Sequence, residues 1–458
     1  MKNTLLFILV VLLLACRKEH STTDPSLQLT INADTLHFDT VFTTTGSVTQ
    51  SFKIFNTANE GIHIASIRLA GGSASPFKIN CNGTPGPVVE DVALAANDSA
   101  YVFVTTTISA TSAATPFVVQ DSIEIAYNGN TRNVQLQAYG QNAHFLHNYT
   151  VTGNEVWKAD LPYVLLGTFS VAENAHLTIT EGCRIYAHAD APLIVNGQLT
   201  VQGDHWDSTR VVFTGDRLDA PYRDLPGSWP GLLFKPSSHD NRLQYAVLKN
   251  ATQAVAVEAS PVTNKLQLNE TIIDNAYDAG IIASNAAITA QNILVSNCGR
   301  NIVLTNGGTY NFAHATVAGF STSYLPHKQP VLSVTNASEN NNSHDLSAVF
   351  RNCIFWGESG GLVPEEVVVS KSGNSAFSVL FDGVLWPLAA APEGTTVTQP
   401  IVQDPEFVSI DPWNQFYDFH LKETSPARNR GVASNVSLDL DGRPRPVGAP
   451  DLGAYEEQ

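Results

Sequence analysis

Three short stretches decide the fold of this chain: Val247-Leu248-Lys249-Asn250, Ile272-Ile273-Asp274-Asn275 and Leu294-Val295-Ser296-Asn297. Their asparagines are spaced 25 and 22 residues apart, and each stretch has a strand-like start before it and another apolar patch after it. Three short strands in each period of this size indicate a solenoid, and strands in place of helices indicate a parallel β-helix. An asparagine at the same place in successive coils predicts a stacked turn whose amides bond to one another, with Asn275 buried in it.

Segments on both sides of this repeat extend the pattern. Thr178–Gly182, Leu193–Leu199 and Val211–Gly215 are strand and turn segments of the same kind, and the chain ends in Asp439-Leu440-Asp441-Gly442-Arg443-Pro444-Arg445 and Asp451-Leu452-Gly453-Ala454-Tyr455-Glu456. This series resembles right-handed parallel β-helix proteins of bacterial cell surfaces, with pectate-lyase-like coils and a C-terminal signature. The resemblance implies a β-helix over residues 154–400 and a cap over 401–458. It specifies the fold and leaves the chemistry open, because this fold hosts lyases, hydrolases, adhesins and spacers.

Residues 27–141 show a different rhythm of short alternating strands. Asp121–Tyr127 and Val134–Tyr139 are joined by Asn128-Gly129-Asn130, a strong hairpin signal. Six or seven such strands predict an antiparallel β-sandwich. The segment resembles the immunoglobulin-like modules that stand beside the anchors of bacterial surface proteins, for which a spacer is the simpler role. The fold class is therefore all-β, a sandwich followed by a β-helix.

The N-terminus carries a targeting signal. Leu5–Leu14 is a ten-residue apolar run after Lys2, too short for a membrane span and suited to a signal peptide over residues 1–15. The run ends in Leu13-Leu14-Ala15-Cys16, which resembles a lipobox. The resemblance implies a lipid on Cys16, a tether over residues 16–26, and anchoring in the outer membrane on its periplasmic face or at the cell surface. An ordinary signal peptide with a chance cysteine is the alternative.

The net charge limits which binding partners are expected, and the cysteine spacing limits which metal sites are expected. The net charge is −17, which disfavours nucleic acid and other polyanions, because binding phosphate needs a concentrated basic face. Four further cysteines show neither metal-binding nor CxxC spacing, which favours small buried side chains although the compartment permits disulfides. They are Cys81, Cys183, Cys298 and Cys353.

One polar insert is the best candidate for binding. Residues 203–231 interrupt the coils and gather aromatic, acidic and basic side chains. Aromatic faces stack on sugar rings while charged groups bond hydroxyls, so this insert predicts a glycan site; a solvated loop with Trp229 covering a coil edge is the alternative. The candidate glycan-binding residues are His205, Trp206, Arg217, Tyr222, Arg223 and Trp229.

Catalytic signatures are missing from the sequence. The motifs of pectin hydrolases and the clustered Asp of calcium-dependent lyases do not occur, and no metal or cofactor site is indicated. Asp439-Leu440-Asp441-Gly442 lacks the further ligands of a calcium loop and predicts a structural turn, with Arg443 and Arg445 beside carboxylates. The sequence favours a non-catalytic surface lipoprotein that displays or binds glycan. A polysaccharide lyase or glycoside hydrolase acting in the β-helix groove is the alternative.

Overall fold

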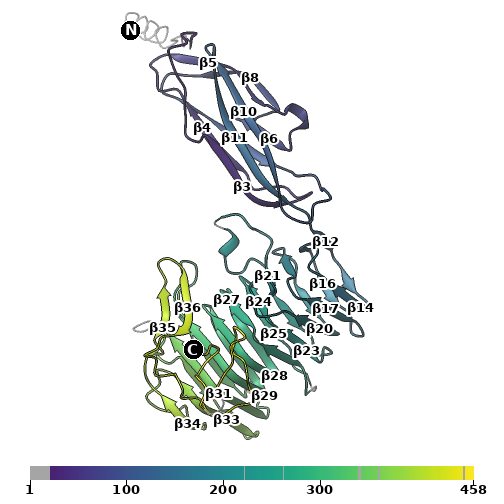
Figure 1. Cartoon of the computed structure of the whole chain (residues 1–458), viewed down its shortest axis with the longest axis vertical. Helices are drawn as coiled ribbons and strands as arrows, with labels where there is room; N and C mark the ends of the chain where they lie inside the picture. The colour runs from purple at the N-terminus through teal and green to yellow at the C-terminus, as the bar shows by residue number, and fades with distance from the viewer. Residues whose placement is uncertain are drawn as a thin grey trace, which may run out of the picture. The chain divides into compact units, whose positions relative to one another are not determined.

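The computed structural model describes residues 21–220, 222–260, 263–338, 342–358, 362–446 and 449–457. It divides into two compact units, residues 1–142 and 143–458, whose strands dominate the chain (Figure 1). The signal peptide and Cys16 lie outside the described residues. No helix in the described ranges is long and apolar enough to cross a membrane. The predicted all-β fold, antiparallel module first and parallel coils second, is confirmed.

The first unit is a sandwich of two sheets around one apolar core. Its predicted hairpin is present, with Asn128 and Gly129 at positive φ between the two longest strands of the unit. Two strand pairs, β1–β5 and β11–β3, are parallel, so the module is only mostly antiparallel. One sheet contains β1 (Ser21–Thr22), β3 (Thr35–Phe42), β5 (Gly61–Leu69), β8 (Val88–Leu94), β10 (Phe117–Tyr127) and β11 (Asn130–Gln141), and the other contains β2 (Thr30–Ile31), β4 (Gln50–Phe55), β6 (Phe77–Cys81), β7 (Thr84–Pro85) and β9 (Ser99–Thr106).

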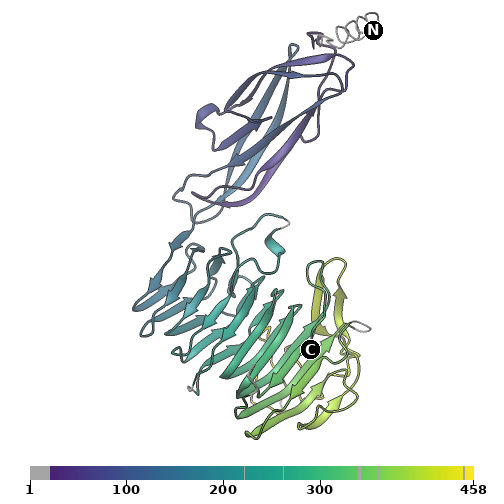
Figure 2. The same cartoon turned by 180° about the vertical axis from the view of Figure 1, so that it is seen from behind.

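The second unit is a parallel β-helix whose strands stack into three faces (Figure 2). It begins with β12 (His144–His147), which already pairs in parallel with the next coil, so the first coil starts about ten residues before the predicted boundary at 154. The strands that form its rungs alternate inward apolar and outward side chains, which fill one long core. All four described cysteines are buried and unpaired, as the sequence favoured.

Each face is a column of strands in register. Face A contains β14 (Asn154–Trp157), β17 (His176–Thr180), β20 (Gln198–Gln202), β23 (Asn241–Gln244) and β26 (Leu266–Asn269); face B contains β12, β15 (Tyr163–Leu166), β18 (Arg184–Ala187), β21 (Val211–Gly215), β24 (Ala246–Lys249) and β27 (Ile272–Asp274); face C contains β13 (Thr150–Val151), β16 (Phe169–Val171), β19 (Leu193–Val195), β22 (Leu232–Phe234) and β25 (Gln253–Val257). The later coils are β28 (Ala279–Ser296), β29 (Arg300–Gly319), β30 (Leu332–Thr335), β31 (Leu346–Gly357), β32 (Val367–Ser370), β33 (Phe377–Leu385) and β34 (Thr396–Ile401).

The corner between faces B and C is the predicted asparagine turn. Asn250, Asn275 and Asn297 all have positive φ, a conformation that asparagine tolerates better than most residues. The Asn275 amide donates to Asn250 Oδ1 at 2.8 Å, as the stacked turn predicts. The stack then stops, because the Asn297 amide points to Asp274 Oδ1 instead, at 3.4 Å. Asn275 is half-buried rather than buried.

The C-terminal region covers a side of the coils. The sequence predicted a cap over the end, but the outer side of face B carries apolar residues such as Leu294, Ala318 and Ile354, which need a cover of their own. A hairpin of β35 (Phe407–Asp411) and β36 (Phe416–Leu421), followed by residues 427–446 and 449–457, supplies it. We call this last segment the strap; with the hairpin it is drawn in yellow-green in Figure 1.

The strap follows the corner between faces A and B across several coils. Asn352 and Val432 exchange two hydrogen bonds of 2.7 and 2.8 Å, and His314 bonds Ser434 at 2.9 Å. Further back along the coils, the Asn292 amide donates to Leu438 O and Arg210 Nη2 donates to Leu440 O. The strap therefore ties the late coils to a coil near residue 210.

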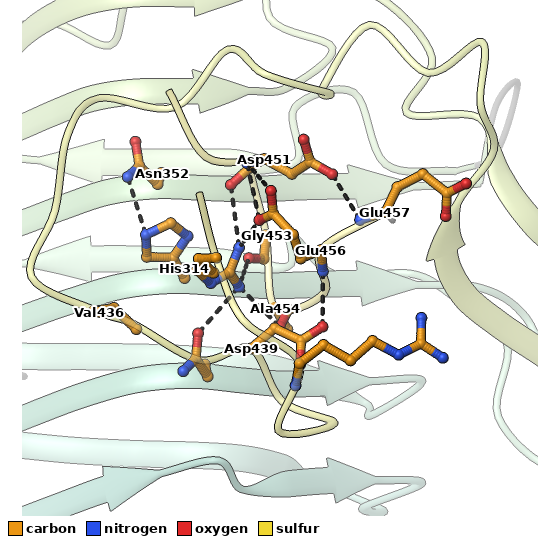
Figure 3. A network of polar contacts seen from close by, with 12 residues as sticks. His314, Asn352, Val436, Asp439, Asp451, Gly453, Ala454, Glu456 and Glu457 are labelled. Atoms are coloured by element: carbon orange, nitrogen blue, oxygen red, sulfur yellow. Dashed lines mark hydrogen bonds and ion pairs between the residues drawn. The ribbon is translucent and has the colours of Figure 1, made fainter. Parts of the chain in front are cut away.

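The C-terminal signature forms the folded core of the strap (Figure 3). The Arg445 side chain is 1% exposed and donates hydrogen bonds to Glu456 Oε2 at 2.7 Å and to Asn292 Oδ1 at 3.1 Å. Asp439 Oδ1 accepts the backbone N–H groups of Asp441 and Arg443, and its Oδ2 accepts that of Glu456. The Asp-Leu-Asp-Gly segment is thus the structural turn that the sequence predicted, with Arg445 beside a carboxylate.

Candidate functional site

The predicted insert is two separate loops, because β21 runs through it. The first loop, residues 203–210, leads from face A to face B, and the second loop, residues 216–231, leads from face B to face C. The second loop contains a short 3₁₀ helix at Tyr222–Asp224. The six candidate residues are therefore divided between two corners of the coil and form no single cluster.

In the second loop, the basic residues are engaged within the loop itself. Arg217 donates two hydrogen bonds to Asp219, at 2.8 and 3.0 Å, and its guanidinium lies 4.0 Å from the centre of the Tyr222 ring. Arg223 pairs with Asp224 at 3.2 Å. Arg217, Tyr222 and Arg223 do not line the pockets described below.

Trp229 corrects the sequence interpretation. It is 1% exposed, stacks on Phe213 inside the coil, and donates its indole N–H to Lys249 O at 2.8 Å. A buried ring whose polar atom is already bonded cannot stack on a ligand. The Trp229 ring belongs to the buried core of the β-helix, so it neither contacts a ligand nor lies over a coil edge.

His205 and Trp206 meet the strap. Trp206 is 64% exposed, and its ring centre lies 4.4 Å from that of His205, whose Nδ1 bonds Asp204 at 2.8 Å. The two residues line an open pocket of about 460 Å³ with the turn at residues 441–444. This first-loop pocket retains two of the six predicted residues.

A second pocket lies where face B turns into face C. We call it the corner groove; its volume is about 360 Å³. Its floor is formed by consecutive coils, with Lys249 and Asp274 paired in register and the asparagine corner beside them. One wall is Asp224 of the second loop, and the other comes from residues 322–324 and from the β35–β36 hairpin. The lining residues are Asp224, Lys249, Asn250, Asp274, Asn275, Asn297, Thr322, Tyr324, Asn414, Gln415 and Tyr417.

The asparagine corner holds the second loop in place. Asn250 Nδ2 donates to Arg223 O at 2.8 Å, and Asn275 Nδ2 donates to Asp224 O at 2.9 Å. Side-chain amides thus replace the missing backbone partners of the loop. Asn275 Oδ1 is buried and accepts no hydrogen bond from the part of the chain that the structure describes.

Asp274 is the acidic group of the groove floor. Its Oδ1 accepts a hydrogen bond from Ser296 Oγ at 2.7 Å and a longer one from the Asn297 amide. Burial raises the pKa of Asp274, against the opposing effects of the Lys249 charge and of these hydrogen bonds. The same floor therefore contains a carboxyl that holds a proton more readily than an exposed aspartate does.

Exposed aromatic residues adjoin the lining residues of the corner groove along the chain. Trp413 is 92% exposed at the tip of the hairpin, directly before Asn414 of the lining, and Phe416 follows Gln415 on its other side. Tyr277, two residues beyond Asn275, and Tyr324 of the lining are exposed as well. Sequence reasoning missed this set. The available signal was an aromatic residue inside the turn Asp411-Pro412-Trp413-Asn414-Gln415, where polar residues are usual.

Among the residues that the structure describes, no group of three or more His, Cys, Asp or Glu side chains is placed to hold a metal ion.

Known proteins add little to this geometry. No family model and no curated protein matches the chain. Among solved structures, a pectate lyase is 12% identical over 62% of this chain and 88% of its own, with a TM-score of 0.24. A family 123 glycoside hydrolase from Clostridium perfringens is 11% identical over 29% of this chain and 30% of its own, with a TM-score of 0.19, so the chain spans under a third of that enzyme. A human PapD-like domain is 12% identical over 28% of this chain and 91% of its own, with a TM-score of 0.18. Likenesses of this size assign neither a family nor an activity.

Proposed function

We propose that this chain is a lipoprotein of the outer membrane, anchored through Cys16, whose β-helix binds glycan in the corner groove. The anchor rests on the ten-residue apolar run that ends in Leu-Leu-Ala-Cys. Two acyl-chain signals give stable anchoring, and lipoprotein processing supplies them at one cysteine.

The observation that supports glycan binding best is the combination of amides, hydroxyls and exposed rings at one groove. Sugars present hydroxyls that pair with amide and tyrosine groups, and apolar ring faces that stack on aromatic side chains. The side chains of Asn414 and Gln415 in the lining offer amides to sugar hydroxyls, and Trp413 beside them in the hairpin turn offers an exposed ring for stacking. Two carboxyls against one lysine in the lining favour a neutral glycan over an anionic one.

Binding to a glycan array tests this proposal, with xylan, mannan and soluble β-glucan as neutral probes. We expect affinities in the micromolar to millimolar range, about −4 to −8 kcal/mol. Trp413→Ala should weaken binding about fivefold, since a lost ring contact of this kind is worth about 1 kcal/mol. Trp206→Ala is the matched control, because it removes an exposed tryptophan from the first-loop pocket.

The two variants separate the two pockets. Loss of binding in Trp206→Ala with full binding in Trp413→Ala would move the site to the first-loop pocket. If the wild type binds none of the neutral probes, glycan recognition is contradicted for both pockets.

One specific observation supports the alternative function, that of a hydrolase or lyase. Asp224, Asp274 and Lys249 line the same groove, so groups able to give and take protons surround the place where the glycan would lie.

A further inference from the structure

The two carboxyls of the corner groove lie in opposite environments. Asp274 stands on the coil floor, where its Oδ1 is held by Ser296 and Asn297. Asp224 stands on the opposing loop with its side chain 67% exposed and its Oδ2 paired with Arg223. Both residues line one pocket, and the main chain at Asp224 is fixed by the Asn275 amide. The pocket thus presents one sheltered carboxyl and one solvated carboxylate to the same ligand.

We propose that the corner groove hydrolyses a glycosidic bond of the neutral glycan that it binds, with Asp274 as the general acid and Asp224 as the general base. This inference rests on the proposed glycan binding. Pairs of carboxyls whose environments differ in this way divide the roles of acid and base in glycoside hydrolysis.

The proposed step is balanced by one water molecule. Asp274 gives its proton to the glycosidic oxygen as the bond from that oxygen to the anomeric carbon breaks. Asp224 takes a proton from water as the water oxygen bonds to the anomeric carbon. The products are two shorter sugars, an ionised Asp274 and a protonated Asp224, and exchange of one proton through solvent restores the starting state.

The groups that face Asp274 suit the role of an acid. Burial raises the pKa of Asp274, which keeps its proton available closer to neutral pH. Lys249, its in-register neighbour on β24, opposes that shift and stabilises the carboxylate that remains after proton transfer. The hydroxyl of Tyr417 on β36, also in the lining, donates to Ser321 O at 3.0 Å, and burial raises its pKa to about 12, so it stays neutral.

Elimination fits the groove less well than hydrolysis. A lyase removes a proton from a uronate and neutralises the sugar carboxylate with cations. The lining offers Lys249 as its cation against Asp224 and Asp274. With Asp274 protonated, Asp224 offsets the charge of Lys249, so the lining has no net positive charge to hold a uronate, whereas a neutral sugar needs none.

The test measures cleavage and binding on the same glycan. Wild type and the variants Asp274→Asn and Asp224→Asn are incubated with the neutral probe that binds best, and newly formed reducing ends are counted beside the affinity. We expect each variant to release reducing ends at least 100-fold more slowly, the usual effect of losing a general acid or base, with affinity changed less than threefold. Asp207→Asn, an exposed aspartate of the first-loop pocket, is the matched control and should cleave like wild type.

A pH profile adds a readout that a structural role would not move. Cleavage should fall with rising pH as Asp274 loses its proton, and the raised pKa of Asp274 places that fall above the pH at which an exposed aspartate ionises. Lys249→Met removes the charge that opposes the raised pKa of Asp274, so the basic limb should shift to higher pH. A basic limb that stays in place would remove Asp274 from the role of acid.

Each outcome decides between the two proposals. Binding at the expected affinity without new reducing ends overturns the hydrolysis and leaves the glycan-binding proposal standing. Unsaturated products in place of ordinary reducing ends show elimination and overturn it as well. No binding of any probe contradicts both proposals together.

Discussion

Arg445 offers the sharpest test of the strap. Its guanidinium makes five hydrogen bonds, to Glu456, Asn292 and the carbonyls of residues 451, 453 and 454. Arg445→Met keeps the apolar stem and removes all five. Breaking a buried ion pair by removing one partner costs about 3–5 kcal/mol, because the other charge stays buried without compensation. Against a typical total stability of about 5–15 kcal/mol, this is a large fraction.

The measurement is urea unfolding followed by circular dichroism, with proteolysis of the strap as a local probe. Arg443→Met is the matched control, because Arg443 stands two residues away with an exposed side chain. We expect the control to stay within about 0.5 kcal/mol of wild type, the usual range for a surface substitution. The double variant Arg445→Met, Glu456→Leu should recover part of the loss, since it removes the stranded carboxylate. Equal stability of Arg445→Met and Arg443→Met would refute the view that this pair holds the strap.

Four other predictions follow from the anchor, the corners and the strap. Cys16→Ser should move the protein from the membrane fraction to the soluble fraction; a mutant that still pellets and labels with a fatty-acid probe would place the anchor elsewhere. Asn275→Ala should lower the free energy of unfolding by about 1–3 kcal/mol and Asn275→Gly by less, because glycine keeps the φ of 56° without strain; equal losses would mean that the amide bonds alone matter. Burial lowers the pKa of His314 to about 3, so unfolding takes up a proton below about pH 6.5; stability should fall by up to about 1.4 kcal/mol per pH unit from there towards pH 3, and His314→Gln should flatten that slope in acid urea titrations. Truncation before Ser437 should give aggregation with β-structure retained, because the outer side of face B loses part of its cover; a soluble monomer by size exclusion would contradict this.

The coils were readable from the sequence because a coil repeats. A residue such as Asn275, at a corner with positive φ, returns at the same place in the next coil, and the repeat shows in a single chain. The corner between faces A and B escaped notice for the opposite reason. Its positive-φ positions hold Tyr245, Glu270, Asn292 and His314, which share a backbone conformation but no side-chain chemistry.

The candidate site was harder, because it is assembled from distant segments. The insert looked like one cluster in the sequence, but β21 separates Trp206 from Tyr222. The corner groove joins Asp274 on the coils to Asn414 on a hairpin 140 residues later, and no local pattern announces such a meeting. Trp229 was misjudged because the sequence around a tryptophan beside charged residues does not show whether its ring points outward or into the core.

The strap makes the opening of the β-helix coils more cooperative. A solenoid without long-range contacts behaves as a row of neighbours, in which one coil can open while distant coils stay closed. Here the hydrogen bonds at Asn352 and at Arg210 belong to one continuous segment, so opening any coil between them disturbs the same fastening. The coils from about residue 210 to residue 357 should therefore exchange their amide hydrogens as one cooperative block, while the coils before residue 200 should open independently of that block.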